Sequence, residues 1–115
     1  MTLKDFLSKL EKQPETLLFK DSIEVIEATY NFTPTTFNNG EVTNNAGQNN
    51  GSCKIFGFGK AQNLSKESTL ACFGEIYRGV CDTPTGTDHQ NIRNFMQYGW
   101  EGLTFEDEKL PLEKK

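Results

Sequence analysis

Phenylalanine is the residue that most restricts what this chain can fold into. The 115 residues include nine Phe but only three Val and four Ala, and each ring buries far more area than a methyl-bearing side chain. A chain of this length is expected to form one domain rather than two. The sequence therefore predicts a single compact core of aromatic rings, and it excludes a chain that is disordered throughout.

The charge balance argues against several kinds of partner. Sixteen acidic and twelve basic residues give a net charge of −4 and a pI near 5.0, and nucleic-acid binding needs a concentrated positive face. No stretch approaches the roughly 18 apolar residues of a membrane-spanning helix. Charged residues also interrupt the first twelve positions, where a secretory signal would be apolar. We expect a soluble, cytoplasmic monomer with no nucleic-acid or membrane partner.

Apolar spacing predicts an α+β fold, with four to five helices and a few short antiparallel strands. The expected helices cover residues 2–12, 15 or 21 to 30, 53–62, 65–80 and 88–99, the last beginning at a cap on Thr87 or Asp88. Thr2, Ser52 and Ser65 are the other expected N-caps. A hairpin is expected to turn around residues 38–40, and a short strand is expected within 100–105.

Two further expectations concern packing and the chain end. Gly57 and Gly59 lie inside a predicted helix, where glycine is unfavourable, so we expect them to permit close approach of another element. Residues 106–115 are charged and contain Pro111. We therefore expect a domain over 1–105 followed by a frayed tail over 106–115.

An uncharged polar loop over residues 42–53 leads to Cys53, at the start of a predicted helix. A thiol in a helix's first turn is activated by the positive end of the dipole. The only histidine, His89, follows Asp88 at another predicted helix start, and Gln48 could stabilise an oxyanion. These four residues are candidate catalytic groups, with a small buried thiol and a loop-capping histidine as the alternative interpretation.

A second interpretation of the same segments is a polar cleft. Asn49 and Asn50 in the loop could face Gln90, Asn91 and Arg93 on the later helix, because amides present donor and acceptor together. Such a cleft would suit a small polar ligand or an extended peptide backbone. Internal satisfaction of backbone groups by the same side chains is the alternative.

Metal, cofactor and disulfide signals are not found in the sequence. Three cysteines without CxxC spacing indicate reduced thiols, with Cys72 packed in a helix and Cys81 exposed. The carboxylates and His89 lack the spacing of metal ligands, so we expect no metal. No glycine-rich segment has phosphate-binding spacing, so we expect no cofactor.

Three segments resemble a known family: residues 46–56 (AGQNNGSCKIF), 70–74 (LACFG) and 86–96 (GTDHQNIRNFM), with Gly99-Trp100 following. They are similar to the HopJ (HopPmaJ) type III effector family of small bacterial proteins, and the resemblance extends over roughly residues 19–105. The resemblance implies a compact α+β domain, an origin in the bacterial cytoplasm and, by the family's description, delivery by a type III secretion system. It implies no established biochemical activity.

Three functions remain open at this point. The preferred one is a binding domain that engages an unknown protein or a small polar ligand through the cleft. The alternatives are a Cys/His-dependent hydrolase or acyl-transfer enzyme with Cys53 as nucleophile, and a housekeeping cytoplasmic protein that is not secreted.

Overall fold

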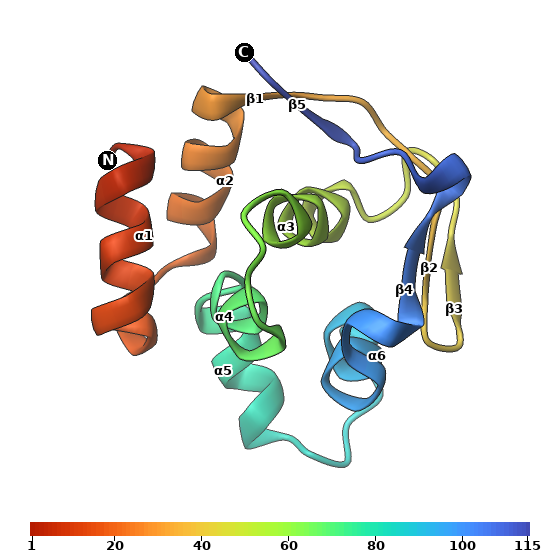
Figure 1. The fold of residues 1–115 in the computed structure, drawn as a ribbon. Helices are drawn as coiled ribbons and strands as arrows, with labels where there is room; N and C mark the ends of the chain where they lie inside the picture. The colour runs from red at the N-terminus through yellow and green to blue at the C-terminus, as the bar shows by residue number, and fades with distance from the viewer.

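The helix α3 (Asn50–Ala61) lies at the centre of the fold, and the other elements surround it in the computed structural model, which describes residues 1–115 (Figure 1). Most of its middle residues, from Cys53 and Ile55 to Phe58, are buried. A helix with so much apolar surface belongs in the interior. The remaining helices are α1 (Leu3–Lys12), α2 (Phe19–Thr29), α4 (Lys66–Ala71), α5 (Glu75–Asp82) and α6 (Gln90–Tyr98).

Five short strands complete the α+β fold, which confirms the predicted class. They are β1 (Tyr30–Phe32), β2 (Phe37–Asn39), β3 (Val42–Asn44), β4 (Leu103–Phe105) and β5 (Leu112–Lys114). Single 3-10 turns cover Pro14–Thr16 (η1), Gly99–Gly102 (η2) and Glu106–Glu108 (η3). One antiparallel sheet has the order β3-β2-β4, and β1 pairs with β5 in a second. None of the helices has the length and apolar character needed to cross a membrane.

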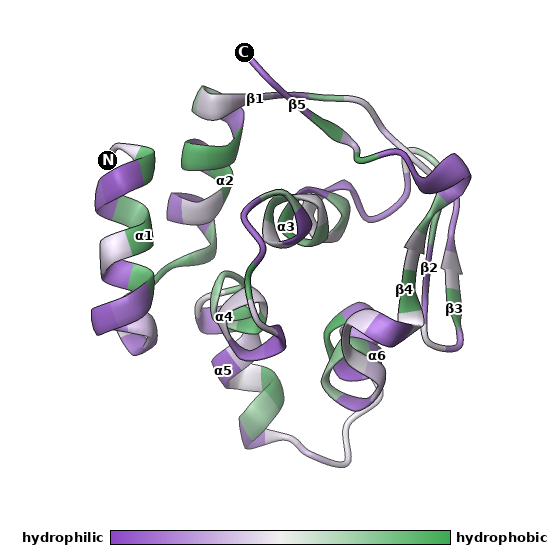
Figure 2. Ribbon diagram, viewed as in Figure 1, coloured by the Kyte–Doolittle hydropathy of each residue, from purple (hydrophilic) through white to green (hydrophobic).

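The core is aromatic, as predicted. Seven of the nine phenylalanines are buried, and the Phe56 ring on α3 is central among them. Its centroid lies 5.9 Å from that of Phe37, 5.5 Å from that of Phe73 and 4.8 Å from that of Phe95. Figure 2 shows that hydrophobic segments of α1 and α2 alternate with hydrophilic ones, as expected for helices that cover a core on one side.

The glycines of α3 do permit close approach. A Cβ at Gly57 would lie 2.7 Å from Pro111 Cγ, and one at Gly59 would lie 2.6 Å from Thr69 Oγ1 and 2.9 Å from Trp100. No side chain larger than hydrogen fits either position without movement of a neighbour. The helix-propensity cost of glycine is therefore offset by tight packing.

Two of the predicted N-caps are confirmed, and in both the side chain accepts a hydrogen bond from an amide three residues later. Thr2 Oγ1 accepts a hydrogen bond from Asp5 N at 3.1 Å, and Ser65 Oγ accepts one from Ser68 N at 3.1 Å. The hairpin prediction is also confirmed, since β2 and β3 pair antiparallel across Gly40-Glu41, with Gly40 at φ +60°. The strand predicted within 100–105 is β4, which follows the turn η2.

The predicted starts of two helices, α3 and α6, are wrong. The helix α3 begins at Asn50 rather than Cys53, so Ser52 lies inside its first turn, and the residue before it, Asn49, is left-handed at φ 53°. The helix α6 begins at Gln90, and His89 before it is left-handed at φ 49°, so no side chain caps it. Contacts between distant segments, described below, hold these two residues in place.

The helix expected over 65–80 is broken at residues 72–74, which separate α4 from α5. Gly74 has φ +60°, and a Cβ there would collide with the backbone of Leu18 and Phe19. Ser22 Oγ donates to the Cys72 carbonyl at 2.7 Å, and the Phe19 amide donates to the Glu75 carboxylate at 2.7 Å. The start of α2 therefore occupies the place where a continuous helix would run.

The prediction of a frayed tail over 106–115 is wrong for its last residues. Leu112 pairs with Phe32 in the β1–β5 ladder and is 7% exposed. The Thr33 amide donates to the Pro111 carbonyl at 2.8 Å, and the Lys115 amide donates to the Thr29 carbonyl at 3.1 Å. The prediction failed because it relied on the charge of the whole segment. Two buried residues, Pro111 and Leu112, are enough to attach the strand to α3.

Candidate functional site

Four asparagines join the hairpin, the polar loop and the start of α6. Asn91 Oδ1 accepts from Asn39 Nδ2 at 3.1 Å and from Asn44 Nδ2 at 3.0 Å, while Asn91 Nδ2 donates to Asn44 Oδ1 at 2.9 Å. Asn49 Nδ2 donates to the same Asn44 oxygen at 2.6 Å. Because Asn39, Asn44 and Asn91 are buried, loss of one partner would leave desolvated amides without hydrogen bonds.

This network brings the starts of α3 and α6 to the two sides of one cleft. The cleft has a volume of about 420 Å³. Its rim is polar and comes from Asn49, Gly51, Ser52, His89, Gln90 and Asn91; its floor is apolar and comes from Phe19, Val42, Phe73, Ile76 and Ile92. No Lys, Arg, Asp or Glu lines it.

Several hydrogen-bond donors at this rim have no acceptor within the protein. The first intrahelical bond of α3 runs from the Cys53 amide to the Asn49 carbonyl at 3.0 Å, and the first of α6 runs from the Ile92 amide to the His89 carbonyl at 3.0 Å. The preceding amides of both helices are therefore unpaired, as helix geometry requires. The Ser52 hydroxyl also makes no hydrogen bond to the protein.

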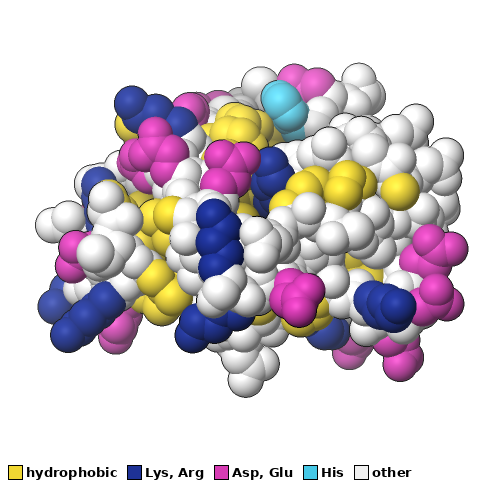
Figure 3. All heavy atoms as spheres, turned by 90° about the horizontal axis from the view of Figure 1, so that it is seen from above, with side chains coloured by type: hydrophobic (Ala, Val, Ile, Leu, Met, Phe, Trp, Pro, Cys, Tyr) yellow, Lys and Arg dark blue, Asp and Glu magenta, His cyan; other side chains and the backbone are white.

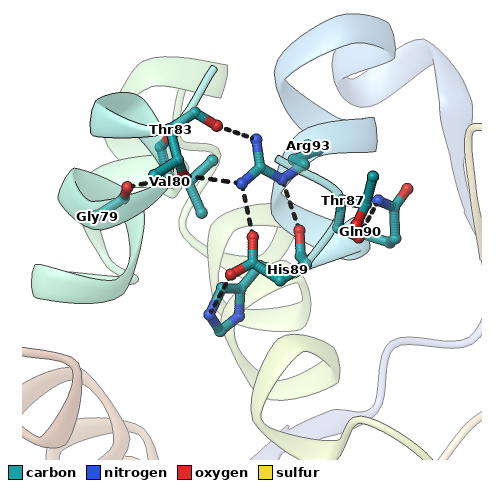
Figure 4. Close-up of polar contacts among 8 residues, drawn as sticks. Gly79, Val80, Thr83, Thr87, His89, Gln90 and Arg93 are labelled. Atoms are coloured by element: carbon teal, nitrogen blue, oxygen red, sulfur yellow. Dashed lines mark hydrogen bonds and ion pairs between the residues drawn. The ribbon is translucent and has the colours of Figure 1, made fainter. Parts of the chain in front are cut away.

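Arg93 faces away from the cleft and holds the loop that precedes α6. Its guanidinium donates to the Thr83 carbonyl at 2.7 Å and to the Asp88 carboxylate at 2.6 Å (Figure 4). The Arg93 ion pair lowers the pKa of Asp88 below its ordinary value. Two of the predicted site residues, Arg93 and Asp88, thus connect the end of α5 to the start of α6.

His89 is exposed at the molecular surface, where it is the only histidine in Figure 3. Its Nε2 lies 4.0 Å from Asp88 Oδ2, and the residue lines the cleft. Next to it, Gln90 also lines the cleft, although its Nε2 is already used in a bond to the Thr87 carbonyl at 2.5 Å. His89 therefore has more freedom than Gln90 to contact a ligand.

The candidate nucleophile does not meet the candidate base. Cys53 is 1% exposed and is not among the cleft-lining residues, and its thiol donates to the Thr35 carbonyl at 3.7 Å. Burial raises the pKa of Cys53 above its ordinary value, which opposes formation of the reactive thiolate. The packing interpretation of this cysteine therefore agrees with its environment, and the geometry does not assemble a Cys53–His89 pair.

The two remaining candidates lie outside the cleft. Gln48 is exposed, and its side-chain oxygen accepts from the Asn45 amide at 3.1 Å, which closes the polar loop. Asn50 is exposed at the first position of α3 and does not line the cleft. Of the five predicted ligand-binding residues, the structure brings Asn49, Gln90 and Asn91 together at one cavity.

Sequence reasoning missed the apolar floor and Ser52 as a rim residue. Phe19 lies on α2, Val42 on β3, Ile76 on α5 and Phe73 in the break between α4 and α5, so no local pattern marks them as one surface. Ser52 was interpreted as a cap, a common role for a serine before a predicted helix. No group of three or more His, Cys, Asp or Glu side chains is arranged to hold a metal ion.

Comparison with known proteins yields one family and one solved structure. The model of the HopJ type III effector protein family matches residues 3–110. The crystal structure of a protein of unknown function, VPA0580, superposes with a TM-score of 0.96 at 52% sequence identity, over 100% of this chain and 95% of that one. None of the curated proteins is a match. The 115-residue chain belongs to the HopJ type III effector protein family.

Proposed function

We propose that this chain is a ligand-binding domain and that the cleft between the starts of α3 and α6 is its binding site. The observation that carries the proposal is one cavity of about 420 Å³ in which an apolar floor meets a rim of hydrogen-bonding groups. Most small-molecule sites combine these two properties. A buried asparagine network gives the cleft a fixed shape before any ligand arrives, which lowers the entropic cost of binding.

The free groups of the rim favour a ligand that presents acceptor oxygens. Unpaired amides and the Ser52 hydroxyl are donors, and the His89 imidazole can donate or accept. The lack of charged side chains on the lining argues against a highly charged ligand. We therefore expect a carbonyl or carboxylate group at the rim and an aliphatic or aromatic group on the floor.

N-acetyl-L-leucine tests this expectation, because it carries an amide, a carboxylate and one apolar side chain. In a ¹⁵N NMR titration we expect the amide signals of Gly51, Ser52, Gln90 and Asn91 to shift. N-acetylglycine should bind about tenfold or more weakly, since a buried leucine side chain contributes about 1.5–3 kcal/mol and 1.4 kcal/mol is tenfold in affinity.

Two variants with matched controls locate the binding. Ser52→Ala and His89→Ala should each lower the affinity for N-acetyl-L-leucine several-fold. The thermal unfolding midpoint should stay near that of the parent, because neither side chain makes a bond that holds the fold. Ser8→Ala and Gln97→Ala change exposed residues outside the cleft and should leave affinity unchanged. Equal binding in all four variants, or shifts confined to another surface, would contradict the proposal.

A further inference from the structure

A second hollow lies between α1 and α4, formed by residues other than those of the cleft. Two adjoining cavities of about 410 and 290 Å³ share Pro14, Glu67 and Ala71 in their linings. They are therefore adjacent, and we call the two together the α1–α4 groove. Its walls are the first helix with the turn after it, and the short helix that follows α3; α1 and α4 are labelled in Figure 1.

The floor of the α1–α4 groove is apolar. Leu7 on α1, Leu64 ahead of α4 and Ala71 at its end are half-buried, so each presents part of its side chain to the groove. Leu10 and Pro14 extend this surface toward the 3-10 turn. Because removal of apolar surface from water is favourable, an exposed apolar floor of this kind favours binding of a partner that covers it.

The rim of the groove is acidic. Glu11, Glu15 and Glu67 line it and are exposed, and none of the three forms an ion pair within the chain. Arg78 is the one cationic side chain among the lining residues, at the end where Tyr77 also contributes. Three carboxylates against one guanidinium leave the rim negative above an apolar floor.

From this combination we infer that the α1–α4 groove is a docking surface for a basic amphipathic segment of a partner protein. Apolar side chains of the segment fill the floor, and its Lys or Arg side chains reach Glu11, Glu15 and Glu67. This is the helix-in-groove mode of recognition, with charge complementarity selecting the partner and accelerating encounter. The same carboxylates repel anionic lipid headgroups, so charge favours a protein partner over a membrane surface.

The test uses a synthetic 14-residue peptide of Leu and Lys, spaced as an amphipathic helix, and a matched peptide with Glu in place of every Lys. When the Leu-Lys peptide is added to the ¹⁵N-labelled full chain, we expect shifts at Leu7, Glu11, Leu64 and Ala71. We expect the affinity to fall as salt is raised. The Leu-Glu peptide should not shift these signals.

Charge-neutral variants separate the groove from general attraction to an acidic protein. The combined variant E11Q/E15Q/E67Q should lower the affinity for the Leu-Lys peptide about fivefold, because exposed ion pairs are individually weak. The control E24Q/E106Q/E108Q removes the same charge at exposed positions outside the groove and should bind like the parent. All six positions are solvent-exposed, so neither variant is expected to unfold.

Three results would overturn the inference. The first is equal weakening by the two triple variants, and the second is binding of the Leu-Glu peptide as tightly as the Leu-Lys peptide. The third is concentration-dependent dimerisation, seen by analytical ultracentrifugation and abolished by E11Q/E15Q/E67Q, which would assign the groove to a second copy of the chain. Because the groove and the cleft share no lining residue, failure here leaves the proposed function untouched.

Discussion

At the scale of single residues, the three cysteines differ by burial, and their reactivity should follow. Burial raises the pKa of the Cys72 thiol to about 12 and that of the Cys53 thiol above its ordinary value, while Cys81 is exposed. The thiolate is the species that reacts, so a raised pKa lowers the reactive fraction at any pH below it. The packed Cys72 and the exposed Cys81 both match what their sequence neighbourhoods predicted.

We therefore predict that iodoacetamide at pH 8 alkylates Cys81 in the native protein, and that Cys53 and Cys72 react only after denaturation. Peptide mass spectrometry over a time course measures each site separately. The His89→Ala variant should leave the Cys53 rate unchanged, because the Cys53 thiol bonds to the Thr35 carbonyl. A Cys53 rate equal to that of Cys81, and lowered by His89→Ala, would restore the enzyme hypothesis.

At the scale of elements, α2 depends on a side chain from α5. Leu18 precedes α2 and cannot cap it, and the Glu75 carboxylate accepts from the Phe19 amide instead. This hydrogen bond lowers the pKa of Glu75 below its ordinary value of 4.5. A lowered pKa stabilises the folded state above pH 4.5, and the contribution is lost as pH falls through the folded-state value.

We predict that Glu75→Gln lowers the free energy of unfolding at pH 7 by about 0.5–1 kcal/mol, a range reduced for solvent exposure. The difference from the parent should narrow between pH 7 and pH 3, because the parent carboxylate loses its charge as pH falls toward its lowered pKa. Urea unfolding at both pH values measures it. Glu24→Gln, an exposed change on α2 itself, should change the free energy of unfolding little at either pH. A Glu75→Gln deficit that is as large at pH 3 as at pH 7 would argue against the charged cap.

At the scale of the whole molecule, the last residues close the fold over α3. Leu112 on β5 is buried against Gly57, while Leu110, two residues earlier, is 41% exposed. We predict that Leu112→Ala lowers the free energy of unfolding by about 2–3 kcal/mol, near the lower end for buried leucines because the strand lies at an edge. Leu110→Ala is the control and should lower the free energy of unfolding much less.

Urea unfolding gives both values if the transition is two-state. Deletion of residues 111–115 should be more destabilising than Leu112→Ala, because it also removes the bonds made by the Thr33 and Lys115 amides. Equal stability of Leu112→Ala and Leu110→Ala would mean that β5 does not contribute to the core.

Features with a local cause were predictable in this chain. The caps at Thr2 and Ser65, the turn at Gly40 and the close approach at Gly57 and Gly59 all follow from one residue and its neighbours in sequence. The aromatic core follows from composition, since nine rings in one small domain have to pack together. The family likewise follows from short, specific segments of the chain.

Features that join distant segments were not predictable from the same patterns. The break at Gly74 exists because the start of α2 packs there, and the left-handed Asn49 and His89 precede helices whose starts are joined through Asn44 and Asn91. The loop and the helix start of the candidate site were recognised, but their apolar floor was not. Sequence spacing encodes the conformation of neighbouring residues, whereas a cleft depends on which surfaces meet after long-range packing, and only the folded chain decides that.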